Sequence, residues 1–225
     1  MVVVEGLKKS FGPVEALKGA SFYVKAGRIT ALLGANGAGK TTSLKIILGF
    51  LRPDAGSLGR RFERAGYVPE HPEFFPFLKG SGVLGLTFKS RGVAGREQER
   101  RVGRYAEKLG FDSALLRRAP VTYSSGTAKK FAYLQSLVLE PDLLVADEPF
   151  SALDPPAIKA ARELFLELRS RGVTILLSSH LLGEMQRVAD DAVIIKQGRV
   201  AAQFSLNGGR YIDLETEFLR LAGDG

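Results

Sequence analysis

The stretch GANGAGKT, residues 34–41, restricts the fold of this chain more than any other feature. It matches the pattern G-x-x-x-x-G-K-[ST] in full, in which glycines let the backbone wrap closely around a phosphate chain. An apolar run precedes it at 28–34, and a segment with helical spacing follows at 40–50. The loop therefore connects a predicted strand to the N-terminus of a predicted helix, where anions bind. We interpret it as a nucleotide-binding loop in preference to a plain glycine turn.

The residues of this loop have separate expected roles. Lys40 supplies a positive charge to the β- and γ-phosphates, and the Thr41 hydroxyl can bind Mg²⁺. The backbone N–H groups of the loop point inward toward the same phosphates. The residues expected to hold the nucleotide are Gly34, Asn36, Gly37, Ala38, Gly39, Lys40, Thr41 and Thr42.

Two further apolar runs end in polar residues that suit hydrolysis. Asp147 ends a buried run of four apolar residues, the place where open α/β sheets bind ligands, and can hold Mg²⁺ directly or through water. Glu148 follows at once and can orient or deprotonate a water that attacks the γ-phosphate. The run at 173–179 leads to His180, which can hydrogen-bond the γ-phosphate or that water. Taken alone, each of these features is more simply explained as polar residues that end a strand. In a chain that also contains a phosphate-binding loop, they predict a hydrolytic site.

Short apolar runs alternate with helical patterns along the chain, which favours an α/β fold with a largely parallel central sheet. A helix is expected at 155–172, because Pro155 opens it and Gly172 closes it. A late hairpin is expected at 191–204, with its turn at Gln197-Gly198, followed by a terminal helix at 212–223. The remaining predicted strands cover 2–7, 20–25, 28–34, 142–147 and 173–179.

Residues 71–125 interrupt this alternation. The segment starts with prolines and aromatic residues and continues as a charged amphipathic helix at 95–111. Its length favours a helical insertion within one domain spanning 1–225, because long loops without structure are uncommon. The aromatic start of the segment either docks against a partner or packs inside the insertion. Its rings are Phe74, Phe75 and Phe77.

Composition narrows the possible classes of function. The chain has 225 residues, of which 45% are hydrophobic, enough to bury one sizeable core. It has no cysteine, which excludes disulfides, thiolate zinc sites and thiol nucleophiles. No apolar run approaches the roughly 18 residues of a membrane span, and Glu5 comes too early for the apolar part of a signal peptide. We therefore expect a cytoplasmic chain, with any membrane spans supplied by a partner.

Taken together, these residues resemble the ATP-binding subunit of an ABC transporter, nearly from end to end. The resemblance is carried by GANGAGKTT at 34–42, LLVADEP at 143–149, SALD at 151–154 and LLSSH at 176–180. It implies an ATPase with ATP and Mg²⁺ as cofactors. The implied fold is a P-loop NTPase core with a mostly parallel central sheet, a small antiparallel β part and an inserted helical subdomain. The implied partners are a second ATP-binding subunit, in a homodimer or a heterodimer, and a separate transmembrane permease.

A serine-glycine signature precedes the acidic strand in this family, and YSSGT at 123–127 occupies that place. By resemblance, Ser124 and Gly126 complete the nucleotide site of the other subunit, and Asp154 faces that subunit across the dimer. Small residues allow close approach and helix N–H groups bind anions, although a serine at this position also commonly caps the helix. Phe11 lies where the family stacks a ring on adenine, but a phenylalanine here suits a core equally.

The sequence departs from the family pattern in three places. Glu70 stands where the family often has glutamine, and a carboxylate near a triphosphate repels it unless Mg²⁺ or a proton intervenes. We take Glu70 as a candidate catalytic and metal-binding residue. The signature is degenerate at Tyr123, Ser125 and Thr127. The segment 53–70 is shorter than usual, so the antiparallel part should be trimmed.

Glu70, the YSSGT form of the signature and the terminal segment 212–223 resemble those of exporters of drugs, antibiotics or polysaccharides. This resemblance implies a chain that is peripheral on the inner face of the cell membrane. Two alternatives stay open. The net charge of +8 suits a soluble ABC-type ATPase acting on nucleic acid or ribosomes. Its basic residues are scattered without aromatic residues between them, so no nucleic acid is expected. The degenerate signature also suits a binding-only half of an asymmetric heterodimer.

Overall fold

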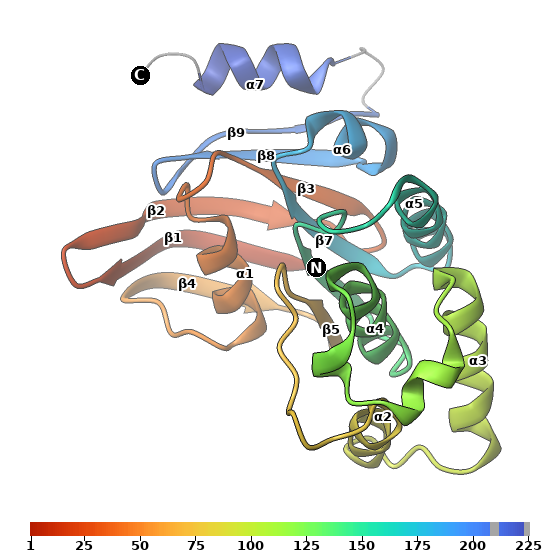
Figure 1. The fold of residues 1–225 in the computed structure, drawn as a ribbon. Coiled ribbons are helices and arrows are strands. Elements are labelled where there is room, and N and C mark those ends of the chain that lie inside the picture. Colours follow the sequence, from red (N-terminus) through yellow and green to blue (C-terminus); the bar gives the residue numbers. More distant parts are fainter. Residues whose placement is uncertain (208–211, 223–225) are drawn as a thin grey trace.

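Two β-sheets organise the computed structural model, which describes residues 1–207 and 212–222 (Figure 1). The larger sheet has the strand order β5 (Ala65–Val68), β6 (Leu143–Asp147), β7 (Thr174–Ser179), β3 (Ile29–Leu33), β8 (Asp191–Lys196) and β9 (Arg199–Ser205). The smaller sheet has the order β2 (Val14–Val24), β1 (Val2–Phe11) and β4 (Ala55–Arg60). Neighbouring strands are parallel from β5 to β8 and antiparallel elsewhere. The predicted α/β class, with a mostly parallel sheet and a small antiparallel part, is confirmed.

The helices follow the start and stop signals of the sequence. Asp154 caps the helix that Pro155 opens, and the predicted helix 155–172 ends at Ser170. The predicted terminal helix begins at Leu214, and residue 223 lies outside the described residues. None of the described helices has the length and apolar character that crossing a bilayer requires. The helices are α1 (Lys40–Leu48), α2 (Gly80–Lys89), α3 (Arg96–Leu109), α4 (Ser125–Leu137), α5 (Pro155–Ser170), α6 (Leu182–Val188) and α7 (Leu214–Ala222).

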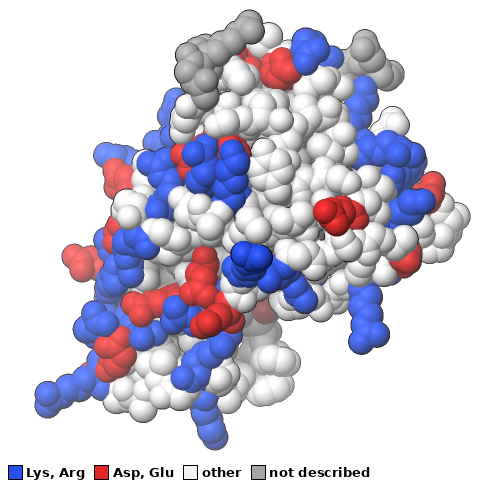
Figure 2. All heavy atoms as spheres, turned by 180° about the vertical axis from the view of Figure 1, so that it is seen from behind, with Lys and Arg blue, Asp and Glu red and all other residues white. Residues whose placement is uncertain are grey.

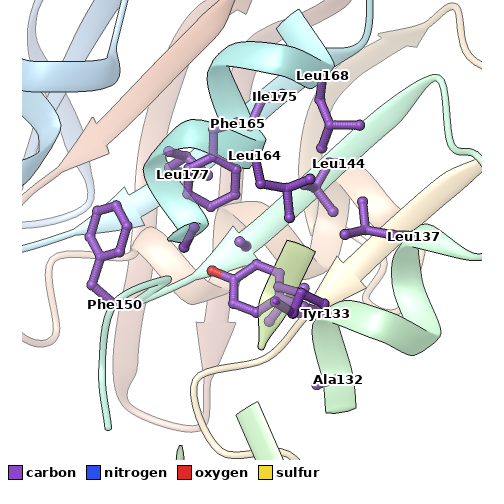
Figure 3. Packing of buried hydrophobic residues seen from close by; sticks show 14 of the residues in the cluster. Ala132, Tyr133, Leu137, Leu144, Phe150, Leu164, Phe165, Leu168, Ile175 and Leu177 are labelled. Atoms are coloured by element: carbon purple, nitrogen blue, oxygen red, sulfur yellow. The ribbon is translucent and has the colours of Figure 1, made fainter. Parts of the chain in front are cut away.

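The larger sheet separates two hydrophobic cores. Strands β3, β6 and β7 are buried along their whole length, as is usual for parallel strands with both faces covered. Successive residues of a strand point to opposite faces, so Leu144 of β6 packs into one core and Val145 into the other. Figure 3 shows the first core, where Tyr133 of α4 and Phe165 of α5 lie over the sheet. The second core lies beneath α1 and the smaller sheet.

The hairpin of β1 and β2 extends beyond the apolar runs that predict it. The residues near the turn of the hairpin are largely polar and exposed to solvent. They therefore lack the apolar pattern by which a strand is recognised in the sequence. Strand β4 pairs with β1 although its six residues, from the short segment 53–70, are mostly exposed. By contrast, the turn predicted at Gln197-Gly198 is confirmed, since both residues have a positive φ and join β8 to β9.

The chain between β5 and α4 contains the helices α2 and α3. The amphipathic segment predicted at 95–111 forms α3, and its apolar face is buried against the core. Its charged face contacts α5, where Arg104 and Lys108 lie 3.3 Å and 2.5 Å from carboxylate oxygens of Glu167. On the face shown in Figure 2, basic side chains are interspersed with acidic ones. This pattern fits paired charges, such as those of α3, better than a continuous basic stripe.

The three phenylalanines that start this region do not share one environment. Phe74 packs against the first core, with its ring 5.3 Å from that of Phe131. Phe75 and Phe77 are 63% and 79% exposed, and their rings lie 5.8 Å apart. Phe74 therefore follows the alternative of packing inside, whereas Phe75 and Phe77 face solvent and their docking to a partner stays a prediction.

Candidate functional site

A pocket of about 410 Å³ lies where β3 and β6 end. Its wall combines the loop that follows β3, the tip of the β1–β2 hairpin, the segment after β5 and the end of β6. These segments are far apart in sequence, and the order of the parallel strands brings them to one edge of the sheet. The predicted site residues that line the pocket are Phe11, Asn36, Gly37, Gly39, Lys40, Thr41, Thr42, Glu70, Asp147 and Glu148.

Glycines in the loop are required by close packing. A Cβ atom added to Gly34 would lie 2.5 Å from the carbonyl oxygen of Ile195. One added to Gly39 would lie 2.6 Å from that of Ala16, and Gly39 also has a φ of 106°. Side chains at these positions would push the loop away from β8 and β2. The loop is thus held closely against both sheets.

Lys40 is buried inside the loop. Its Nζ donates hydrogen bonds to the carbonyl oxygens of Gly34 at 2.8 Å and Ala35 at 3.2 Å, and lies 3.8 Å from a carboxylate oxygen of Glu148. A buried ammonium is costly unless it is paired, and these contacts keep the positive charge at the pocket wall. Phosphate oxygens are suitable acceptors for the same group.

The hydroxyl of Thr41 and the carboxylate of Asp147 meet in the pocket. Thr41 Oγ1 donates a 2.6 Å hydrogen bond to Asp147 Oδ2, and Ser178 Oγ donates to the other carboxylate oxygen. Oxygen ligands of this kind suit Mg²⁺, which takes one or two protein ligands together with phosphate and water. No group of three or more metal-binding acidic or histidine side chains occurs among residues 1–207 and 212–222. The donor set fits a nucleotide-associated Mg²⁺ better than a protein-only metal site.

Glu148 is buried and held from several sides. Ser179 Oγ donates a 3.1 Å hydrogen bond to one carboxylate oxygen, and His180 Nδ1 lies 2.9 Å from the other. The backbone of Glu148 has a φ of 44°, a strained value that persists only where the surroundings enforce it. Ser178 and Ser179 were not predicted as site residues. In the sequence both residues simply end an apolar run. The structure shows that this run forms β7, which pairs with β6.

Glu70 and Phe11 lie at the rim of the pocket. The Glu70 carboxylate is partly exposed, with His71 Nε2 at 3.7 Å. Nearby, burial raises the pKa of Tyr67 to about 12, and the negative charges of Asp147 and Glu70 add to that effect. The ring of Phe11 is 48% exposed, so it is not a core residue. Its position is compatible with stacking on a base, which stays a prediction.

Ser124, Gly126 and Asp154 do not line this pocket. Ser124 caps α4, accepting a hydrogen bond from the Thr127 N–H at 3.3 Å, and Asp154 caps α5 in the same way. The capping interpretation of Ser124 is therefore correct, but it leaves the exposed N-terminus of α4 open to other molecules. A Cβ atom added to Gly126 would lie 2.7 Å from the carbonyl oxygen of Ala152, so α4 begins in contact with the segment after Glu148.

Comparisons with known proteins agree with this geometry. The sequence model of the ABC transporter family matches residues 17–151. The chain is 33% identical over 207 residues to an uncharacterized ABC transporter ATP-binding protein, YxlF of Bacillus subtilis, covering 89% of this chain and 70% of that protein. It is 35% identical over 212 residues to Nod factor export ATP-binding protein I of Ralstonia nicotianae, covering 89% and 65%.

Solved structures give the same result. The structure of an ATP binding subunit of an ABC transporter superposes with a TM-score of 0.88 at 32% identity, over 98% of this chain and 99% of that one. The bacterial ABC transporter cassette MJ0796, at 23% identity, shares the fold with a TM-score of 0.84 over 92% of this chain and 100% of that one. The chain therefore belongs to the ABC transporter family and is an ATP-binding ATPase domain of that family.

Proposed function

We propose that this protein hydrolyses Mg-ATP as one half of a head-to-tail dimer and thereby powers export through a separate transmembrane permease. The observation that carries the proposal is the convergence of Lys40, Thr41 and Glu148 on one pocket, while Ser124 lies outside it at an exposed helix end. The pocket thus combines groups that suit phosphate binding and water activation, and Ser124 is left for the pocket of a second subunit.

Each residue of the pocket has a chemical task. Lys40 and the N–H groups of the loop bind the phosphates, and Phe11 supports the base. Thr41 and Asp147 would hold Mg²⁺, which neutralises charge on the phosphates when it is bound. The carboxylate of Glu148 orients a water and accepts its proton. His180 and Ser179 hold that carboxylate in place, at the distances given above, and Glu70 contributes a second carboxylate at the rim.

The second subunit would contribute Ser124 and Gly126. The N-terminus of α4 carries free N–H groups and the positive end of the helix dipole, which together bind a γ-phosphate. Asp154 caps α5 immediately after the segment that contacts Gly126, so it lies near the same interface. The dimer is either a homodimer or a heterodimer with a related chain.

Docking to a permease would use the exposed aromatic residues of the region at 71–125, which we propose to be an inserted subdomain. Phe75 and Phe77 are exposed in this region. The region also has a hollow of about 520 Å³ that is lined in part by Phe74, Val121 and Tyr123. Exposed aromatic and proline surfaces of this kind are suited to an apolar segment of a partner protein. Docking there would hold the protein on the cytoplasmic face of the cell membrane.

Export is favoured by one relative in particular. Nod factor export ATP-binding protein I is 35% identical to this chain over 212 residues. We infer the same direction of transport here, for a cargo that the permease recognises.

The test uses the Glu148→Gln variant, in which hydrolysis is slowed so that a closed dimer accumulates. We expect its mass in solution to double when Mg-ATP is added, and Ser124→Arg to abolish the doubling. Ser90→Arg, a matched change at an exposed serine of the α2–α3 connection, should leave the doubling intact. ATP binding without doubling would restrict the proposal to a heterodimer. Failure to bind ATP would contradict the proposal itself.

A further inference from the structure

Lys129 of α4 is a buried cation close to the pocket. Only 1% of the residue is exposed. Its Nζ donates hydrogen bonds to the carbonyl oxygens of Pro69 at 2.8 Å, Glu70 at 3.3 Å and Asp147 at 3.1 Å. It does not line the pocket and so would not touch the nucleotide.

These contacts account for the full capacity of the side chain. An ammonium group has three N–H donors, and each has a carbonyl acceptor here. Burial lowers the pKa of Lys129 to about 8, and the carboxylates of Asp147, Glu70 and Glu148 oppose that shift. Removing a cation from water is unfavourable unless its partners are specific. Lys129 therefore depends on the exact placement of the Pro69–Glu70 segment and of the end of β6.

The same face of α4 contacts the catalytic segment at two other points. One turn before Lys129, Gly126 packs closely against Ala152. One turn after it, the Tyr133 hydroxyl donates a 2.7 Å hydrogen bond to the carbonyl oxygen of Pro149. Residues three and four apart lie on one side of a helix, so this side faces the backbone on both sides of Glu148. A displacement of α4 would be transmitted to that backbone.

We propose that Lys129 is a positioning residue that couples the two nucleotide sites of the dimer. The N-terminus of α4 presents Ser124 to the nucleotide of the partner subunit. Lys129, on the same helix, contacts the backbone of Glu70 and Asp147 in the site of its own subunit. The inference rests on the dimeric site of the proposed function. Contact of Ser124 with a γ-phosphate shifts α4, and Lys129 carries the shift to Glu70 and Asp147. Because such coupling is reciprocal, the order of binding does not matter.

The test compares two neighbouring lysines. Lys129→Met keeps the length and apolar stem of the side chain but removes all three donors. Lys130→Met is the matched control, because its Nζ donates an exposed hydrogen bond to the carbonyl oxygen of Gly110, 3.3 Å away. Lys129→Arg restores a buried cation with several donors. Each variant is made in the wild-type chain for kinetics and in Glu148→Gln for measurements on the dimer.

Two kinds of readout separate coupling from a structural role. For Lys129→Met we expect kcat to fall by about tenfold to a hundredfold, as is found when a residue that orients a metal ligand is removed. The Kd of ATP should change by less than about twofold. The Hill coefficient for ATP should fall from above 1 to about 1. In the Glu148→Gln background, dimer formation should slow hydrogen exchange at residues 68–71 by about fivefold in the parent but not in Lys129→Met. Lys130→Met should match the parent, and Lys129→Arg should recover part of each effect.

Three outcomes would overturn the inference. The first is a Lys129→Met protein whose kcat, Hill coefficient and exchange at 68–71 match the parent, or whose only change is a lower melting temperature. The second is a parent dimer that forms with ATP but has a Hill coefficient of 1. The third is unfolding of both Lys129→Met and Lys129→Arg, which would show that Lys129 serves the fold alone. A parent that binds ATP without dimerising would instead count against the dimer of the proposed function.

Discussion

The Thr41 hydroxyl donates a 2.6 Å hydrogen bond to the Asp147 carboxylate across a separation of 106 residues. Thr41 follows β3 and Asp147 ends β6, and these strands are not neighbours, because β7 lies between them. Ser178 of β7 binds the second oxygen of the same carboxylate. The start of α1 and the ends of β6 and β7 therefore bring the two proposed Mg²⁺ ligands together.

Asp147→Asn should separate nucleotide binding from magnesium dependence. The amide keeps the size of the side chain and its hydrogen bond from Thr41 but binds Mg²⁺ weakly. We expect ATP hydrolysis to fall by about a hundredfold or more, while ATP binding in EDTA is not weakened. Calorimetry with and without Mg²⁺ gives the affinities. Asp142→Asn, at the other end of β6 and paired with Arg64, is the control and should leave hydrolysis intact. Equal losses in both variants would contradict the assignment.

Glu70→Gln should reveal the repulsion between this carboxylate and the phosphates. A like charge several ångströms away at a partly exposed site is worth about 1 kcal/mol. Without Mg²⁺, ATP should therefore bind the variant roughly three- to tenfold more tightly. Glu73→Gln removes an exposed charge three residues further on and should not change the affinity. An unchanged affinity for Glu70→Gln would place the carboxylate away from the phosphates when ATP is bound.

Gly126→Ala should destabilise the start of α4. The added methyl group would lie 2.7 Å from the carbonyl oxygen of Ala152, and overpacking of this kind costs about 1–3 kcal/mol. ATP-dependent dimerisation should weaken as well, because the helix end moves. Urea unfolding and solution mass measure the two effects. Gly85→Ala in α2 is the contrasting change, since its Cβ meets nothing within 4 Å and alanine is favoured in helices by up to about 1 kcal/mol. A stability gain in both variants would show that Gly126 is not tightly packed.

Phe74 and Phe75 should respond in opposite ways. Phe74→Ala removes a ring that packs against Phe131 and should lower the free energy of unfolding by about 2 kcal/mol or more. Phe75→Asp changes an exposed ring and should alter stability by less than about 0.5 kcal/mol. We expect Phe75→Asp nevertheless to lose co-purification with the permease while it still binds ATP. Retained co-purification would remove Phe75 from the docking surface.

Glu167 should make the contact between α3 and α5 sensitive to acid. The hydrogen bond from Lys108, with further help from Arg104, holds the pKa of the Glu167 carboxyl below its ordinary value of 4.5. A lowered folded-state pKa gives stability that is present above pH 4.5 and is lost as the pH falls below it. At pH 7, Glu167→Gln should cost roughly 0.5–1 kcal/mol, since the pair is partly exposed.

The difference between wild type and Glu167→Gln should shrink when urea unfolding is repeated near pH 3. Glu163→Gln, at an exposed position on the same helix, should show no such dependence. A difference that is the same at both pH values would mean that the Glu167 charge does not stabilise this contact.

Local features of the sequence were sufficient for the nucleotide loop. The glycine spacing of residues 34–41 is a local pattern, and Gly37 and Gly39 adopt positive φ angles that glycine allows. The packing of Gly34 against Ile195 and of Gly39 against Ala16 has no such local signal. The apolar runs before Asp147 and His180 placed these residues at strand ends for the same local reason. The hairpin turn at Gln197-Gly198 also depends on two adjacent residues.

Contacts between distant segments were not determined by any local pattern. The pairing of Asp147 with Ser178 follows from strand order and register, and β4 has no apolar alternation to mark it. In the sequence Lys129 and Lys130 are alike, and so are Phe74 and Phe75. In the structure Lys129 is buried and Lys130 less so, and Phe74 is partly buried while Phe75 is exposed. Sequence alone determined the chemistry of the loop and strand ends, because backbone geometry is local. Only the tertiary structure decided which side chains meet, because burial depends on how the helices pack against the sheet.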